Sequence, residues 1–247
     1  MFISQLMKKD SYYFCSDISD RMNEIFIKRF GESEFSKEQE IKLKHLEDAD
    51  TVDVERTVQE LGEDYNRKVF VHKVNCETLP YSDASFDLYI ASLSLMIVVN
   101  HHNQLSEAYR VLEDGGTAGF SVWGRSENST FFTFFPEVVS KAGFPFPVPT
   151  RTNFHLNDKE SLVKDMKAAG FKGVKAFYTL TSPNLGTSEE LFQFYAECPH
   201  YKPHLSSLSE EDYEKVTRNF GKMYEEKFGE DSIDPPTWEM LIITGQK

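Results

Sequence analysis

The sequence predicts an α/β fold built on an open, mostly parallel sheet with helices on both faces. Three observations indicate it. Short apolar runs alternate with segments whose apolar side chains recur every three or four residues, as in amphipathic helices. Capping residues and glycines separate these segments. No Gly/Ser-rich or Pro-rich linker divides the 247 residues, so we expect one domain over 1–247.

The first half of the chain carries four short apolar runs typical of buried strands: Tyr12–Ser16, Val69–Val74, Phe86–Ser92 and Thr117–Trp123. The third is almost continuously apolar, as expected of a strand buried on both faces. An amphipathic helix follows the first run and ends near Gly31. A second helix spans Gln104–Leu112 and ends at Gly115-Gly116.

The second half repeats this rhythm. A helix capped by Asn157 or Asp158 ends at Gly170, and the strand Gly173–Thr181 follows. Three further elements are predicted: a helix over Ser188–Cys198, a helix after the capping-box pattern Ser207–Glu210, and a last strand, Trp238–Thr244.

The charge is strongly negative, with 27 Lys and Arg against 40 Asp and Glu. We therefore expect no nucleic-acid partner and no anionic membrane surface, because both require clustered cations. Residues 31–68 carry 12 acidic and six basic side chains. Because this segment is also poor in apolar residues, we expect a helical or mobile acidic insertion outside the core.

Cysteine is sparse. Cys15, Cys76 and Cys198 are widely spaced and form no C-x-x-C pattern, so neither a disulfide framework nor a metal site is expected. No secretory signal pattern begins the chain, and the longest apolar run, Leu93–Val99, is too short to span a membrane. These features predict a cytoplasmic location.

Polar residues follow the predicted strands, where ligands bind in open α/β sheets. Asp17 follows the first strand and suits a ribose, because its two oxygens accept from both hydroxyls; alternatively, it caps the next helix. Asn75 offers an amide to an adenine edge, or is an ordinary turn residue. Cys76 and Glu77 come next, and Leu93 follows the third strand.

Two runs of the sequence resemble class I S-adenosylmethionine-dependent methyltransferases. Residues 75–88 contain Leu79-Pro80 and Phe86-Asp87, and residues 107–116 contain Arg110-Val111-Leu112 and Gly115-Gly116. The spacing is most similar to the small-molecule group related to ubiquinone and menaquinone biosynthesis, the methyltransferase type 11-like enzymes. Residues 14–22 resemble that family's second strand and its ribose-binding acid, and the resemblance covers roughly residues 10–125.

The resemblance implies a Rossmann-like sandwich with Trp238–Thr244 as a late antiparallel strand, S-adenosylmethionine as cofactor and a small-molecule acceptor. By the same resemblance, Asp17 binds the ribose and Asn75 and the Cys76 backbone meet the adenine amine. Ile18 and Met22 pack on the adenine ring, and Leu93 lines the methionine end. Glu77 completes the predicted cofactor set.

Candidates for chemistry at the acceptor are fewer. His101 or His102 is suited to act as a general base if the acceptor is protonated, or belongs to a polar turn before a helix. The aromatic-rich segment 126–150 is expected to cover the acceptor, which favours an apolar or aromatic molecule. Core packing is the alternative for half of its six phenylalanines, Phe131, Phe132, Phe134, Phe135, Phe144 and Phe146.

No glycine precedes Gly31, whereas a glycine-rich loop lies ~20 residues before the ribose acid in dinucleotide-binding folds. The sequence therefore predicts that the family's first strand and its loop are missing, which leaves two strand edges open to self-association or a partner chain. Three explanations stay open: a fragment of an active enzyme, a catalytically inactive interaction subunit, or residues 1–6 filling the gap as an antiparallel strand.

Overall fold

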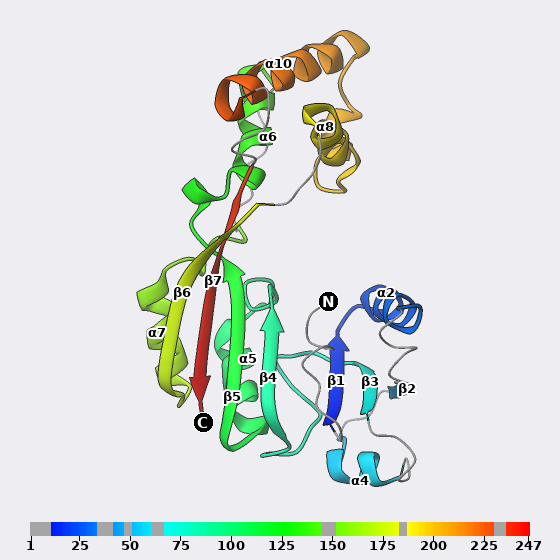
Figure 1. The fold of residues 1–247 in the computed structure, drawn as a ribbon, viewed down its shortest axis with the longest axis vertical. Coiled ribbons are helices and arrows are strands. Elements are labelled where there is room, and N and C mark those ends of the chain that lie inside the picture. Colours follow the sequence, from blue (N-terminus) through cyan, green and yellow to red (C-terminus); the bar gives the residue numbers. More distant parts are fainter. Residues whose placement is uncertain are drawn as a thin grey trace.

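The computed structural model describes residues 11–33, 42–46, 51–60, 67–144, 152–182, 187–229 and 236–247. Within these ranges the strands form two sheets (Figure 1). The smaller sheet is fully parallel, in the order β1-β3-β2, and consists of β1 (Ser11–Asp17), β2 (Lys42–Leu46) and β3 (Arg67–Lys73). The larger sheet, in the order β4-β5-β7-β6, consists of β4 (Phe86–Ser92), β5 (Leu112–Trp123), β6 (Lys172–Thr181) and β7 (Trp238–Gln246).

Strand directions confirm the predicted α/β class. β4 runs parallel to β5, whereas β7 is antiparallel to both β5 and β6. The predicted late antiparallel strand is therefore present and lies inside the larger sheet. Gly115, with φ of 86°, lies in the first part of β5, in a backbone conformation that favours glycine.

The two sheets meet at β1 and β4, each the end strand of its own sheet, and no described strand lies between them. The absence of the family's first strand stays a prediction, because residues 1–10 lie outside the described residues. Aromatic side chains join the sheets: the Phe14 ring stacks on Phe70 at 4.5 Å and meets Phe86 at 5.4 Å, and Tyr81 meets Phe86 at 5.1 Å. The proposed role of residues 1–6 lies outside the described residues.

The helices of the described ranges are α2 (Asp20–Gly31), α4 (Val54–Gln59), α5 (His101–Val111), α6 (Thr130–Lys141), α7 (Lys159–Ala168), α8 (Ser188–Glu197), α9 (Lys202–Leu205) and α10 (Glu210–Phe228), with a 3-10 turn at Ser126–Asn128. Asp158 caps α7, one of the two predicted possibilities. The capping box belongs to Thr187 and Glu190 of α8, and α10 starts after Ser209, two residues later than the expected cap.

Helices cover only one face of the larger sheet in the described part of the chain. α5 and α7 pack there, and Leu105, Ala108 and Met166 are fully buried against it. On the opposite face Leu88 is 51% exposed and Phe177 is 53% exposed. The expectation of helices on both faces is therefore met for one face alone.

The acidic segment 31–68 differs from the prediction. Residues 42–46 form a strand that pairs with β3, and the side chains of Leu46 and Val52 are buried in the same cluster as Phe70 and Val111. The prediction of a helical insertion outside the core is wrong for these residues. Strand pairing and two buried side chains attach them to the smaller sheet.

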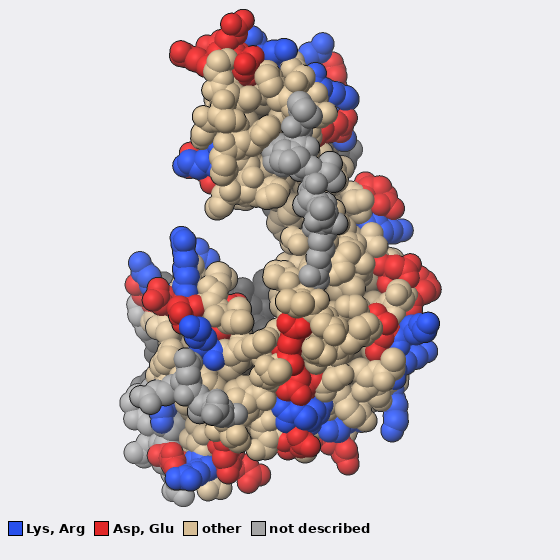
Figure 2. All heavy atoms as spheres, turned by 180° about the vertical axis from the view of Figure 1, so that it is seen from behind, with Lys and Arg blue, Asp and Glu red and all other residues tan. Residues whose placement is uncertain are grey.

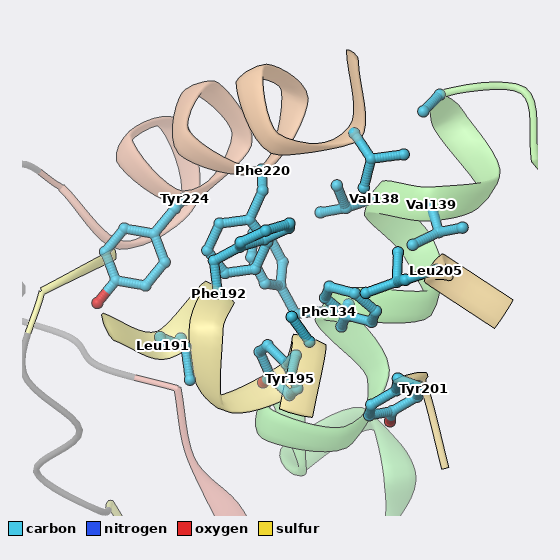
Figure 3. Close-up of a cluster of buried hydrophobic side chains, with 14 of the residues drawn as sticks. Phe134, Val138, Val139, Leu191, Phe192, Tyr195, Tyr201, Leu205, Phe220 and Tyr224 are labelled. Atoms are coloured by element: carbon cyan, nitrogen blue, oxygen red, sulfur yellow. The ribbon is translucent and has the colours of Figure 1, made fainter. Parts of the chain in front are cut away.

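A helical lobe, made of α6, α8, α9 and α10, stands beyond one end of the larger sheet (Figure 1). Its own apolar core is densely aromatic, with Phe134, Phe135 and Phe220 almost completely buried (Figure 3). Half of the predicted acceptor cover is therefore core packing: Phe131, Phe134 and Phe135 are buried, whereas Phe132 and Phe144 are partly buried. Phe146 lies outside the described residues.

None of the described helices is long and apolar enough to cross a membrane.

Candidate functional site

The carboxyl ends of β1, β4 and β5 point towards the helical lobe (Figure 1). Figure 2 shows a deep open hollow between this lobe and the smaller sheet. In open α/β sheets the carboxyl ends of the strands are where ligands bind. The floor of this cleft is therefore the place to look for the predicted site residues.

Asp17 is the last residue of β1 and is half-buried. Its Oδ1 accepts from the backbone N–H of Ser19 at 2.8 Å, and Ser19 itself is the N-cap of α2. The alternative in which Asp17 caps that helix is therefore wrong. Within the described residues Oδ2 has no hydrogen-bond partner, so one carboxylate oxygen is available to a ligand.

Two exposed apolar side chains flank Asp17. Ile18 is 63% exposed and Met22 is 51% exposed. Both follow the end of β1, one in the connecting turn and one in the first turn of α2. Apolar side chains left open beside a carboxylate fit a ligand with an apolar ring next to hydroxyl groups.

Asn75 lies two residues beyond β3, which pairs with β1 so that Asp17 is opposite Lys73. The structure thus brings Asp17 and Asn75 to neighbouring strand ends. The Asn75 Oδ1 accepts from the Glu77 N–H at 3.0 Å, so the turn role proposed for this residue is real. No described group accepts from its Nδ2, which therefore remains free to donate to a ligand.

Cys76 and a hollow complete this end of the cleft. Burial raises the pKa of the Cys76 thiol, so the group is a neutral, apolar neighbour rather than a nucleophile. A cavity of about 440 Å³ opens beside Asn75. It is lined by Lys73, Val74, Asn75, Thr78, Leu79, Pro80 and Glu107.

Glu77 has a structural role in the site. Its two carboxylate oxygens accept from the backbone N–H of Asn100 at 2.6 Å and of Val99 at 3.3 Å. These bonds tie the loop after β4 to the turn after β3. Because both oxygens are used, Glu77 shapes the site through that loop.

Leu93, the first residue after β4, adopts a left-handed conformation with φ of 55°. Its N–H donates to the Ser121 carbonyl at 2.9 Å and lies 3.1 Å from the Ser121 hydroxyl. Such a conformation costs a non-glycine residue free energy, and it occurs often at ligand sites. The strained loop therefore lies between two anchors, Ser121 and Glu77.

Arg110 holds the turn that contains Leu79 and Tyr81. The sequence motif included Arg110 but did not indicate this role. Its guanidinium donates to the carbonyls of Tyr81 at 2.7 Å and Leu79 at 2.9 Å. It also donates to Glu107, whose carboxylate accepts from the Leu79 N–H at 2.6 Å. The guanidinium lowers the pKa of Glu107, which keeps this carboxylate charged at neutral pH.

His101 and His102 begin α5, next to the anchored loop. The His101 Nε2 lies 3.0 Å from the Asp165 Oδ2 of α7, and the two imidazole rings are 4.0 Å apart at their centres. Asp165 was not among the sequence candidates. The general-base role of the two histidines stays a prediction.

Partly buried aromatic rings gather where β5 and β7 meet the helical lobe. Trp123 lies 4.7 Å from Phe132 and 6.0 Å from Trp238, and Phe132 lies 5.9 Å from Phe154. Arg125 lies 4.3 Å above the Tyr178 ring and forms an ion pair with Glu239. We call Trp123, Phe132, Phe154 and Trp238 the aromatic group of the cleft.

Comparisons with solved structures find similar architectures at low identity. The chain is 15% identical to phosphoethanolamine N-methyltransferase 2 of Haemonchus contortus, solved with phosphomonomethylethanolamine and S-adenosylhomocysteine, with a TM-score of 0.44, covering 100% of this chain and 52% of that one. The chain is 18% identical to the [4+2]-cyclase SpnF, with a TM-score of 0.47, and the match covers 99% of this chain and 80% of that one. It is 17% identical to a SAM-dependent methyltransferase of Thermotoga maritima, with a TM-score of 0.43, and the match covers 99% of this chain and 86% of that one.

A search of the curated proteins finds no match to the sequence. A scan against family models finds one that matches residues 1–120 and is described as a methyltransferase domain. The matched part contains every predicted cofactor residue and the Arg110 turn. Residues 1–120 therefore match a methyltransferase domain.

Proposed function

We propose that this chain transfers a methyl group from S-adenosylmethionine to a small apolar or aromatic acceptor. The observation that carries the proposal is the meeting of Asp17 and Asn75 at adjacent strand ends, beside the exposed Ile18 and Met22. A carboxylate oxygen, an amide and two apolar side chains match a ribose, an adenine edge and an adenine ring. These residues lie inside the segment that matches the family.

The cofactor supplies the chemistry, because its sulfonium carbon is open to in-line displacement by a nucleophile. The protein's task is then positioning and exclusion of water. In this proposal Asp17 accepts from the ribose hydroxyls, and Ile18 and Met22 cover the adenine. The loop from Leu93 to Asn100, held by Ser121 and Glu77, borders the methionine end.

The class of acceptor is proposed from the aromatic residues that lie where β5 and β7 meet the helical lobe. The aromatic group of the cleft offers half-buried ring surface, and a flat apolar molecule would bury itself against such rings. The helical lobe contributes Phe132 through α6. We also propose a cytoplasmic location, which the three free cysteines support.

A second function is favoured by one observation: among the described strands, β1 and β4 each have an edge without a strand partner. In this alternative the chain is a catalytically inactive interaction subunit, or part of an enzyme that a further segment completes. Both alternatives predict weak or absent cofactor binding by this chain alone.

Calorimetric titration of S-adenosylmethionine into the purified chain tests the proposal. Micromolar binding is expected. Asp17→Ala should weaken it roughly 10- to 150-fold, because a hydrogen bond to a charged group contributes about 1.5–3 kcal/mol. Asp20→Ala is the matched control, since among the described residues its exposed carboxylate forms an ion pair with Lys73. Absence of binding up to millimolar cofactor would exclude catalysis by this chain alone and support the interaction subunit.

A further inference from the structure

We propose that His101, His102 and Asp165 form a binding site for one divalent transition-metal ion, with zinc as the best match. Each side chain offers one ligand atom, and the three atoms all lie within 4.8 Å of one another. Two come from the first turn of α5 and the third comes from α7. A bound ion would therefore link the two helices that cover the larger sheet.

The distances are close to those of a zinc site. Zinc lies about 2.0–2.2 Å from nitrogen and carboxylate oxygen ligands, which places tetrahedral ligand atoms roughly 3.3 Å apart. The His101 Nε2 and the Asp165 Oδ2 are already 3.0 Å apart. The ligand atom of the exposed His102 lies within 4.8 Å of the other two, and the ring has to turn towards them to reach the tetrahedral spacing.

The donor set selects the class of metal. Two imidazoles and one carboxylate suit zinc, nickel or copper, whereas magnesium and calcium prefer oxygen ligands alone. Three protein ligands leave a fourth position for water. In the bound state the neutral His101 ring would carry its single proton on Nδ1, which leaves the Nε2 lone pair for the ion in place of the contact with Asp165.

The ligand atoms are not committed elsewhere in the ranges that the structure describes. Asp165 pairs with His101, and no described hydrogen bond engages the His102 ring. The simpler interpretation is a hydrogen bond between helices, made by His101 and Asp165 alone. His102 takes no part in that bond, so its contribution distinguishes the two interpretations.

The site was not predicted from the sequence, because 64 positions separate His101 from Asp165 and the cysteine pattern gave no zinc signal. The proposal also competes with the general-base role of the histidines. A ring nitrogen bound to a metal cannot accept a proton from an acceptor.

The test is calorimetric titration of Zn²⁺ into the full chain, after removal of metal by a chelator and alkylation of the three cysteines. One ion per chain is expected. His102→Ala and Asp165→Asn should each weaken binding at least tenfold, on the order of what loss of a supporting ligand shell costs. His45→Ala, which removes an exposed histidine of β2, should leave binding unchanged.

Thermal unfolding with and without Zn²⁺ is the second readout. The metal should raise the melting temperature of the wild type but not of His102→Ala, whose metal-free melting temperature should equal that of the wild type. Equal zinc affinity in the wild type and His102→Ala would overturn the site. So would the absence of binding at millimolar Zn²⁺, which would leave only the hydrogen bond between helices. Neither result bears on the titration of S-adenosylmethionine.

Discussion

Glu239 shows how one buried carboxylate fastens the larger sheet to the chain that leads into the helical lobe. Its oxygens accept from the N–H, Nε and Nη2 of Arg125 at 2.7–2.8 Å and from the Asn128 Nδ2 at 2.7 Å. These hydrogen bonds and the guanidinium charge outweigh burial and lower the pKa of Glu239 to about 2. A cluster so fully bonded fixes the direction in which the chain leaves β5.

Glu239→Gln should destabilise the protein by about 2–3 kcal/mol at pH 7, because the substitution removes the charge and leaves one acceptor fewer. The folded pKa lies below the unfolded value. The stabilisation is therefore complete above the usual pKa of 4.5 and is lost as the pH falls towards about 2. Urea unfolding at pH 7 and pH 3 should show the cost of the substitution reduced by about half or more at pH 3.

Glu127→Gln is the control for this experiment, because the Glu127 side chain is exposed. It should change stability by less than about 0.5 kcal/mol. A cost of Glu239→Gln that is the same at both pH values would show that shape, not charge, makes the difference.

Single site residues could be predicted where their signal is local. Asp17 and Asn75 were found because each follows an apolar run, and the strands then carry them to one edge. Asp165 and Glu239 had no such signal, because their partners lie 64 and 114 positions away in the sequence. Only the packing of α7 and the pairing of β7 bring those partners near.

Among the elements, the helical lobe depends on aromatic packing between α6, α8 and α10. Phe220 of α10 is 1% exposed, and its ring lies 5.2 Å from Phe134 and 5.3 Å from Phe192 (Figure 3). One ring thus contacts both other helices. Its removal leaves a cavity that the neighbouring rings cannot fill without leaving their own positions.

Phe220→Ala should cost about 3–5 kcal/mol of unfolding free energy, as deletions of buried rings do. Phe194→Ala, at a ring that is 49% exposed on α8, should cost far less. Chemical denaturation of both variants measures the difference. Similar losses for both would contradict a lobe held together by its buried rings.

The strand Phe86–Ser92 could be predicted from its continuous apolar run, but the expectation that it is buried on both faces is wrong, because Leu88 and Ile90 are exposed. The strand β2 was missed because its sequence, KLKHL, has only two apolar residues, which do not alternate with a period of two, and lies in an acidic segment. Its place is set by pairing with β3. Local propensity carries no information on that partner.

At the scale of the described fold, the defining feature is a pair of end strands, β1 and β4, that pair neither with each other nor with a third described strand between them. In a parallel strand, alternate residues direct their N–H groups to opposite sides. Every second amide of β4 therefore points away from β5 and lacks a described strand partner, whereas β5 is paired on both sides.

Hydrogen exchange followed by NMR should reveal this asymmetry. Alternate amides of β4 should exchange much faster than their neighbours, and the central amides of β5 should be protected throughout. Uniform protection of β4 at high protein concentration, lost on dilution, would show that a second chain occupies the edge. Uniform protection at every concentration would show that the edge is covered within the chain.

The fold class and the late antiparallel strand could be predicted because they follow from element order. The division of the described strands into two sheets had no local signal in the sequence. The helical lobe as a separate body could not be predicted, since α6 is separated from α8 and α10 by α7 and β6. Their association depends on long-range contacts that a linear pattern does not record.

The chain makes two excursions into the helical lobe, one after β5 and one between β6 and β7, and returns to the same sheet each time. The proposed cofactor residues all precede the first excursion. The sequence of the helical lobe can therefore change during evolution while the proposed cofactor residues stay the same. Under the proposed function, related enzymes should diverge in the molecule they methylate sooner than in the donor they use, and exchanging the helical lobe between two of them should change the acceptor but not the donor.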